Sequence, residues 1–413
     1  MSIYRLLQLR EKEGQSIGVA VIGAGQMGFG MISQISRVPG MQVRGVADIN
    51  KQAAENAVDF YLSQLEQKHP VAVSDDFRQV IQQDSVDVVV DATGVPEVGA
   101  KVALQALLAR KHLVLLNVEV DVTIGSILAK MFTSANLVYT GSAGDEPAAT
   151  LELFEFAKTM GLDVVVAGKG KNNPFIPTAN PDTCAEEAKR KHMSSHMLAA
   201  FQDGTKTMAE MNLLSNATGF IPDKVGMHGV SADVKTVGDK LKLTSEGGVL
   251  DKYGVVEYVH GLAPGVFVIV HSPLKPVDDE LRYLSVGKGP YYTLYRPYHL
   301  ASLETPISVA RAILLNDPTI APIGGPISET VAVAKRNINA GERVDGIGGY
   351  SVRGVIETHN DTIANGHIPI GLIAGHAVAK RNIPEGRFLT TDDIELDSTT
   401  TVWHLRKLQD GLF

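Results

Sequence analysis

Residues 17–28 read IGVAVIGAGQMG, and this stretch decides the fold of the first part of the chain. The apolar run at residues 17–22 is typical of a buried strand. Gly23, Gly25 and Gly28 follow it directly, and the apolar spacing of the residues that come next predicts a helix. A strand, a glycine-rich turn and a helix in this order predict the first βα unit of a parallel sheet.

Further strand-like runs follow, and helical segments lie between several of them. These runs are residues 41–47, 87–90, 113–116, 137–140 and 163–167. Strands that alternate with helices predict an α/β fold of the Rossmann type, in which a doubly wound parallel sheet is connected by right-handed crossovers. We expect this domain to occupy residues 1–168.

The rest of the chain divides into two parts of different character. Residues 169–326 mix glycine- and proline-rich turns with helical and β-rich runs, which predicts an α+β substrate domain. Residues 332–338 and residues 377–383 both read AVAKRNI. Because two copies indicate repeated strand–turn units, we expect residues 327–413 to form a small β-rich domain.

Composition and charge restrict the class of protein. The 413 residues include 38 Lys and Arg against 46 Asp and Glu, and this acidic balance argues against a nucleic-acid partner. No run approaches the ~20 apolar residues that span a bilayer, and the N-terminal residues lack the apolar core of a signal peptide. A lone cysteine, Cys184, fits a reducing compartment. We therefore expect a soluble, cytoplasmic protein without a membrane partner.

The glycine-rich turn carries the pattern of a dinucleotide-binding site. An acidic residue, Asp48, follows Gly28 by 20 positions, as the fingerprint requires. Asp48 favours NAD because it would hydrogen-bond the ribose hydroxyls, whereas Lys51 nearby could accept the extra phosphate of NADP, so both cofactors stay open. The predicted cofactor-binding residues are Gly23, Gly25, Gln26, Met27, Gly28, Asp48, and, where the strand at residues 87–90 ends, Thr93 and Gly94.

Two later segments predict a site for a small anionic substrate. The run AGKGKNNP, residues 167–174, reads as a loop with many hydrogen-bond donors, and we expect Lys169, Lys171, Asn172 and Asn173 to bind an anion there. The alternative is a solvated basic loop. In LYRPYHL, Arg296 and His299 stand among aromatic residues, where they would either bind substrate or hold the domain in place. These two residues complete the predicted substrate site.

Asp203, Lys206 and Glu210 are the predicted catalytic residues. They are three and four positions apart and would share one face of a helix. Lys206 could then protonate a carbonyl oxygen as hydride arrives, held by either carboxylate. The alternative is an exposed ladder of salt bridges.

Asp145 and Glu146 are the candidate metal ligands. Adjacent carboxylates after a predicted strand could hold a divalent cation or orient a substrate hydroxyl. Acidic residues at the start of a helix are also stabilising without any ligand, so both interpretations stay open.

Six motifs together resemble the homoserine-dehydrogenase-like NAD(P)-dependent oxidoreductases that carry a C-terminal SAF domain. The motifs are IGAGQMGFGM, DATGVPEVG, LLNVEVDVTIG, AGKGKNNP, DGTKTMAEMN and LYRPYHLASLETP. The AVAKRNI copies and IPEGRFLTTDDIEL resemble SAF strand–turn units. The resemblance covers nearly the whole chain and implies an oxidoreductase.

That family includes a reductoisomerase-like enzyme that converts 1-deoxy-D-xylulose 5-phosphate with NADPH in the methylerythritol phosphate route to isoprenoids. For a similar protein the resemblance implies that Lys169 and Lys171 contact the substrate phosphate and that Asp145 with Glu146 hold a metal. The alternatives are a homoserine-type or sugar-acid dehydrogenase, and a non-catalytic nucleotide-sensing or carbohydrate-binding protein. The architecture also leads us to expect a homodimer.

Overall fold

The computed structural model describes residues 2–374 and 376–413. By their internal contacts they form two compact units. Unit 1 comprises the residues up to Asp145 together with Leu300–Ala321 and Thr400–Phe413, and unit 2 comprises Glu146–His299 and Pro322–Thr399. The division into 1–168, 169–326 and 327–413 stays a prediction. The two compact units do not correspond to these three ranges, because Leu300–Ala321 and Thr400–Phe413 belong to the same unit as the N-terminal residues.

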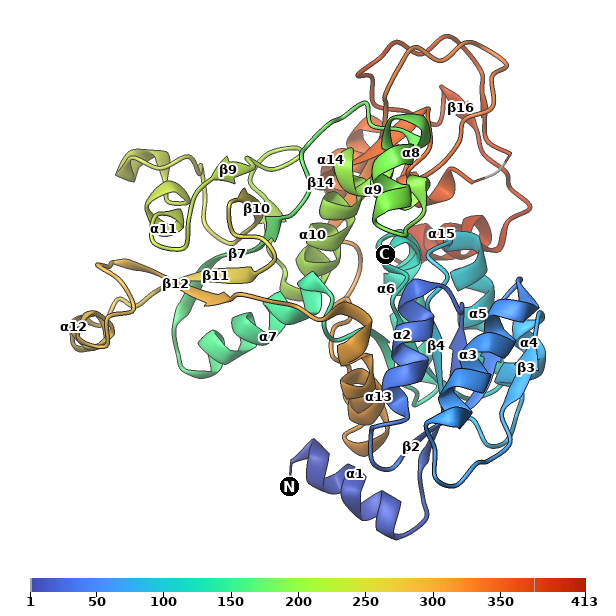
Figure 1. The fold of residues 1–413 in the computed structure, drawn as a ribbon. Helices are drawn as coiled ribbons and strands as arrows, with labels where there is room; N and C mark the ends of the chain where they lie inside the picture. The colour runs from blue at the N-terminus through green and yellow to red at the C-terminus, as the bar shows by residue number, and fades with distance from the viewer. Residues whose placement is uncertain (1, 375) are drawn as a thin grey trace. The chain divides into compact units, whose positions relative to one another are not determined.

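Unit 1 is a parallel sheet flanked by helices (Figure 1). Its strands are β1 (Ile17–Ile22), β2 (Met41–Ala47), β3 (Ala72–Ser74), β4 (Val88–Asp91), β5 (His112–Leu115) and β6 (Tyr139–Gly141). Its helices are α1 (Ile3–Lys12), α2 (Gln26–Ile35), α3 (Lys51–Ser63), α4 (Phe77–Ile81), α5 (Pro96–Leu108), α6 (Val118–Ser134), η2 (Ala301–Glu304), α13 (Thr305–Leu314) and α15 (Thr401–Leu412).

The order of these strands confirms the predicted Rossmann fold. The sheet runs β3-β2-β1-β4-β5-β6, and every neighbouring pair is parallel. This is the doubly wound order in which the connections leave β1 in opposite directions. All six residues of β1 are buried because both its neighbours and both helical layers cover it. The C-terminal helix α15 packs against α5 and α6 and completes one helical layer.

One predicted strand lies in a different sheet. Residues 163–167 were expected in the parallel sheet, but they belong to β7 (Asp163–Lys171) at the centre of a second, mixed sheet in unit 2. A short apolar run identifies a strand but does not show which strands it pairs with. The predicted strand is therefore present, but its assignment to the parallel sheet was wrong. The edge strand β3 of the parallel sheet, which is only three residues long, was missed.

Unit 2 contains a mixed sheet and several short β pieces. Its strands are β7, β8 (Ile221–Pro222), β9 (Val230–Ser231), β10 (Val255–His260), β11 (Val266–His271), β12 (Tyr291–Arg296), β13 (Ser328–Ala334), β14 (Val352–Thr358), β15 (Val378–Ala379) and β16 (Ile394–Glu395). Its helices are α7 (Glu146–Thr159), α8 (Pro181–Arg190), α9 (Ser195–Gln202), α10 (Thr205–Thr218), α11 (Val237–Lys240), η1 (Thr244–Glu246), α12 (Lys275–Tyr283), α14 (His359–Asn365) and η3 (Ile370–Leu372).

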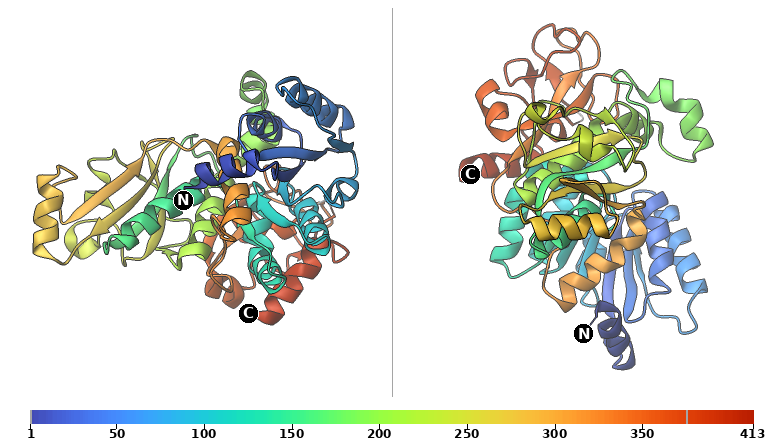
Figure 2. Two further views of the ribbon diagram at one scale, coloured as in Figure 1. Left: turned by 90° about the horizontal axis from the view of Figure 1, so that it is seen from below. Right: turned by 90° about the vertical axis from the view of Figure 1, so that its left-hand side faces the viewer.

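The mixed sheet places β7 between β10, which is parallel to it, and β11, which is antiparallel. Helix α7 runs along β7 and β11 (Figure 2). With a helix on one face and apolar residues of the α11 region on the other, β7 is buried from its second residue to its last. The end of β7 is therefore a place where polar side chains are held away from bulk water.

The two AVAKRNI copies are related by an approximate two-fold repeat. The backbone N–H groups of Ile338 and Ile383, the last residues of the copies, each donate to the other's carbonyl at 2.8 Å. Equivalent bonds join Gly341 to Ala379 at 2.7 Å and Gly386 to Ala334 at 2.9 Å. Each copy therefore closes its strand on the turn of the other, which gives the repeated strand–turn units that the sequence predicts.

Candidate active site

The glycine-rich turn of unit 1 has three glycines with different surroundings. Gly23 has φ +100°, and a Cβ there would lie 2.9 Å from the carbonyl carbon of Ala92. A Cβ on Gly28 would lie 1.9 Å from the carbonyl oxygen of Gly23. A Cβ on Gly25 would meet no atom within 4 Å. The outer glycines thus permit the tight turn, and the middle one leaves open space over the start of α2, which fits the pyrophosphate of a dinucleotide.

The carboxylate of Asp48 lies against this turn at the end of β2. It accepts hydrogen bonds from the backbone N–H of Ala24 at 2.7 Å and of Asn50 at 2.8 Å. Gln26 and Met27 are exposed at the first turn of α2. These positions fit the predicted cofactor roles, because Asp48 fixes the turn and still has lone pairs for ribose hydroxyls.

The adjacent strand β4 ends in a second polar cluster. The backbone N–H and the hydroxyl of Thr93 donate to the buried carboxylate of Asp91 at 2.9 and 2.7 Å. The side-chain amide of Asn117 donates to the other carboxylate oxygen at 3.0 Å. Gly94 follows with φ +67°. Since β1 and β4 are neighbours, Thr93 and Gly94 lie at the same sheet edge as the glycine-rich turn, where doubly wound sheets bind their ligands.

In unit 2, Lys169 and Lys171 lie in a strand, and the prediction of a loop for residues 167–171 was wrong. A Cβ on Gly168 would lie 2.0 Å from the carbonyl oxygen of Glu257, and one on Gly170 would lie 2.2 Å from the Ala263 nitrogen. The glycines thus allow neighbouring backbone to approach, and they do not form a turn. Because side chains alternate along a strand, the two lysines point to one face.

Lys169 is the centre of a buried ionic cluster. Its ammonium group bonds Glu146 at 2.8 Å and also bonds Glu210, and His299 lies 3.3 Å from the same Glu146 oxygen. Burial alone would lower the pKa of Lys169, but attraction to the two carboxylates raises it above the ordinary value for lysine. Burial and repulsion from Glu146 raise the pKa of Glu210. The structure thus brings together four residues that the sequence placed in four separate motifs.

The carboxylates of this cluster already have a cationic partner. Glu146 was a predicted metal ligand with Asp145, which immediately precedes it and is the last residue of unit 1. The Lys169 ammonium occupies the position between Glu146 and Glu210 that a cation would need. A divalent cation would compete with this ammonium group for the carboxylates, and the metal role of Asp145 and Glu146 stays a prediction.

Helix α10 carries two of the three predicted catalytic residues. Lys206 is half-buried and lies one helical turn before Glu210. Its positive charge opposes the rise in the pKa of Glu210 that burial and Glu146 cause. Asp203 is not on the helix, so the predicted shared face is wrong at that residue. Gly204 has φ +90° and separates α9 from α10, and the Asp203 carboxylate accepts from the Thr205 N–H at 2.8 Å. A second partner of Asp203 is Lys335, at 2.6 Å.

The remaining predicted substrate-binding residues are divided. The Lys171 ammonium donates to the Phe201 carbonyl at 2.9 Å, and burial with repulsion from Lys169 lowers its pKa to about 8. Asn172 is exposed and Asn173 half-buried where β7 ends. Arg296 donates to Glu152 of α7 at 3.0 Å, an interaction that fits the alternative of holding the domain in place.

Sequence reasoning missed Arg353 and Phe175, which lie beside Lys171. The Lys171 nitrogen is 5.9 Å and the Arg353 guanidinium carbon 5.7 Å from the centre of the Phe175 ring. Arg353 comes from β14, far along the chain. The motif pattern around residue 353 resembles an ordinary strand, so only the three-dimensional structure places this residue at the site.

Family models match three segments of the chain. The model described as "Oxidoreductase DRL, catalytic domain" matches residues 144–305. "Dihydrodipicolinate reductase, N-terminus" matches residues 17–117, and "SAF domain" matches residues 329–395. The chain thus contains segments that match an oxidoreductase catalytic domain, the N-terminal domain of a reductase and a SAF domain. Both predicted cofactors, NAD and NADP, are dinucleotides of the kind that a Rossmann-type domain binds.

Individual relatives are more distant. A glycosyl hydrolase family 109 protein of Shewanella baltica is 26% identical over 98 residues, which are 23% of this chain and 21% of that protein. The chain thus matches about a fifth of the length of this curated relative. Myo-inositol dehydrogenase of Lactobacillus casei is 16% identical with a TM-score of 0.44, covering 75% of this chain and 88% of that one. A probable dehydrogenase of Thermotoga maritima is 11% identical with a TM-score of 0.45, covering 75% and 91%. Such structural similarity carries no argument about substrate.

Among the helices of residues 2–374 and 376–413, none combines the length and the apolar character that crossing a bilayer requires.

Proposed function

We propose that the protein is an NAD(P)-dependent dehydrogenase or reductase that interconverts a hydroxyl and a carbonyl group on a small, anionic, polyhydroxylated compound of the sugar or sugar-acid class. The observation that carries the proposal is the buried cluster of Lys169, Glu146, Glu210 and His299 beside Lys206, within the segment that matches an oxidoreductase catalytic domain. A cluster of buried charges is costly to maintain, and perturbed ionisable groups of this kind concentrate at functional sites.

The residues of the chain divide the work of such a reaction. The bound dinucleotide supplies or accepts the hydride, and Gly23, Gly25, Gly28 and Asp48 would hold it. In the reductive direction, the Lys206 ammonium gives its proton to the carbonyl oxygen as hydride reaches the carbonyl carbon, so that a carbonyl, a reduced dinucleotide and a proton become an alcohol and an oxidised dinucleotide.

Lys169 and Glu210 act through Lys206. Glu210 attracts the charge of Lys206 from one helical turn away, and Lys169 holds Glu210 in place. Since the pKa of Lys169 is raised, Lys169 keeps its proton and serves as a fixed positive charge. We therefore assign a positioning role to Lys169. The proton transfer to the substrate is assigned to Lys206.

A second candidate is the reductoisomerase-like conversion of 1-deoxy-D-xylulose 5-phosphate. The pair of cations Lys171 and Arg353 beside Phe175 favours it, because a phosphate group is a suitable counter-ion for two desolvated cations. The Lys169 ammonium already bonds Glu146 and Glu210 and would compete with a metal for these carboxylates in that reaction. The homoserine-type dehydrogenase activity likewise stays a prediction.

Oxidation of NADH and NADPH by the purified full chain, followed by nicotinamide absorbance, tests the proposal. The panel comprises keto-sugar acids, inososes, aspartate semialdehyde, and 1-deoxy-D-xylulose 5-phosphate with and without Mg²⁺. We expect turnover with an anionic polyhydroxylated member. Turnover only with the deoxyxylulose phosphate would select the second candidate. Bound dinucleotide without turnover on any member would reject the proposed reaction and favour a nucleotide-sensing protein.

A further inference from the structure

We propose that Lys171 and Arg353 form an oxyanion subsite, so that the SAF domain supplies a substrate-binding residue to the catalytic domain. The inference rests on the proposed function and extends it, because it names the charged group of the substrate and the side chains that bind it. Lys171 is the last residue of β7, and Arg353 is the second residue of β14, within the segment that matches the SAF model.

The SAF hairpin is held against the catalytic domain by specific contacts inside unit 2. The backbone N–H of Gly354 donates to the hydroxyl of Thr205 at 2.8 Å, and the hydroxyls of Ser215 and Ser328 lie 2.6 Å apart. A Cβ on Gly354 would lie 2.7 Å from a methyl carbon of Thr330 and 3.0 Å from one of Thr205, so β14 lies tightly on the first turn of α10. Arg353 is thereby fixed next to the helix that carries Lys206.

Lys171, which is buried, and Arg353, which is half-buried, differ from the buried Lys169 and Lys335 in the groups that they bond. Lys169 bonds two carboxylates, and Lys335 pairs with Asp203. Among the residues that the structure describes, Lys171 hydrogen-bonds only a carbonyl oxygen, and the Arg353 guanidinium donates to no oxygen at all. Two cations that are largely removed from water without a bonded carboxylate are costly unless an anion joins them.

Phe175 lies beside both cations. The residue is 37% exposed, and both cations lie within 6 Å of the centre of its ring. An Arg guanidinium offers a planar fork of N–H donors and a Lys ammonium a compact charge, a combination that suits a phosphate or carboxylate group. Burial lowers the pKa of both Lys171 and Arg353, whereas attraction to the Asp203 carboxylate raises it at both residues. The shared ligand chemistry is thus an oxyanion, as a phosphate monoester or a carboxylate.

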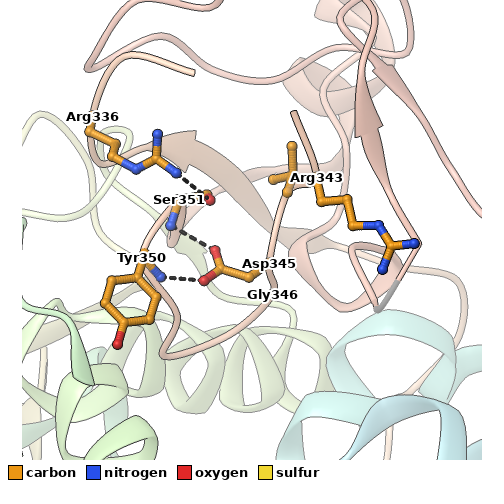
Figure 3. Close-up of a pocket in the computed structure, with 7 residues that line it drawn as sticks. Arg336, Arg343, Asp345, Gly346, Tyr350 and Ser351 are labelled. Carbon is orange, nitrogen blue, oxygen red and sulfur yellow. Dashed lines mark hydrogen bonds between the residues drawn. The ribbon is translucent and has the colours of Figure 1, made fainter. Parts of the chain in front are cut away.

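A second charged pocket of the SAF domain offers a matched control. It is lined by Arg336, Arg343, Val344, Asp345, Gly346, Tyr350 and Ser351. Figure 3 shows the Asp345 carboxylate bonded to the backbone of Tyr350 and Ser351, at 2.5 and 2.7 Å, and Arg336 bonded to Ser351. The exposed side chain of Arg343 points away from Asp345. Replacing Arg343 by a neutral residue therefore changes the net charge of the SAF domain as much as replacing Arg353 does, and it leaves Lys171 and Arg353 in place.

Calorimetric titration of the full chain with inorganic phosphate and, separately, with acetate tests the subsite. We expect phosphate to bind the wild type, and Arg353→Gln and Lys171→Met each to weaken it by about 10- to 100-fold, as the loss of a charged hydrogen bond predicts. Arg343→Gln should bind phosphate like the wild type. Tighter binding of phosphate than of acetate would assign the group to a phosphate monoester, and the reverse order to a carboxylate.

The inference would be overturned if neither anion binds the wild type, or if Arg353→Gln, shown by circular dichroism to be folded, binds as well as Arg343→Gln does. Equal weakening in all three variants would indicate a general charge effect and would also overturn it. The readout needs neither dinucleotide nor turnover. Anion binding without any redox turnover would therefore reject the proposed function and leave the subsite standing, whereas turnover without anion binding would do the opposite.

Discussion

Replacing Lys206 by methionine is expected to lower kcat by about 10²- to 10⁴-fold, the range of general acid catalysis by one side chain. The binding of the dinucleotide should not change, because the account assigns that binding to Gly23, Gly25, Gly28 and Asp48 and not to Lys206. The measurement is steady-state turnover on the substrate that the panel identifies, with a separate titration of the dinucleotide. Lys189→Met, which removes an exposed lysine from α8, is the matched control and should be fully active.

The conservative variant Lys206→Arg separates proton transfer from simple charge. Arginine keeps the positive charge beside Glu210 but does not release a proton at any ordinary pH. We expect Lys206→Arg to be nearly as inactive as Lys206→Met. Recovery of most of the activity in Lys206→Arg would contradict the acid role and reduce Lys206 to a counter-ion of Glu210.

Replacing Lys335 by methionine should reduce the free energy of unfolding by about 3–5 kcal/mol, the cost of removing one partner from a buried ion pair. The side chain of Lys335 is 2% exposed and that of Asp203 is fully buried. Lys335 also donates to the carbonyl oxygens of Ala179 at 2.6 Å and Gly349 at 2.9 Å. The substitution thus leaves a buried carboxylate and two carbonyl groups without their donor.

The second AVAKRNI copy provides the control. Lys380 occupies the same position in the repeat, but it is exposed, and within residues 2–374 and 376–413 its hydrogen bond goes to the Thr391 carbonyl at 2.9 Å. Lys380→Met should change stability by at most about 0.5 kcal/mol. Guanidinium unfolding followed by circular dichroism measures both variants, and hydrogen exchange in α10 and β13 localises the loss.

Adding Asp203→Asn to Lys335→Met should restore part of the stability, since it removes the uncompensated charge. Equal effects of the two lysine substitutions would show that the buried ion pair contributes little.

Local sequence was sufficient for the nucleotide-binding fold. A Cβ on Gly28 would meet the carbonyl oxygen of Gly23, five residues away, so the spacing of the motif carries this contact, although Gly23 itself makes room for Ala92 of a distant segment. The same reasoning was wrong for Gly168 and Gly170. There the glycines permit a close approach by backbone of residues 257 and 262–263, a contact that spacing within residues 167–174 does not encode.

The assembly of the catalytic cluster could be predicted only in part. Lys206 and Glu210 are one helical turn apart, which the sequence shows directly, but their union with Glu146 and His299 depends on how β7 and α7 pack. Lys335 and Lys380 stand in identical heptapeptides, and only one of them meets a buried carboxylate. Identical local sequence cannot distinguish them, because the difference lies in which surface each copy meets.

Titration of NADH and of NADPH into the full chain, followed by nicotinamide fluorescence, tests the central claim most directly. The account predicts saturable binding of at least one of them by the wild type, and its loss in Gly25→Val, because that side chain would fill the open space over the turn. Gly30→Val, in equally open surroundings on α2, should fold and bind like the wild type. Failure of the wild type to bind either dinucleotide, or binding by Gly25→Val equal to that by Gly30→Val, would contradict the account.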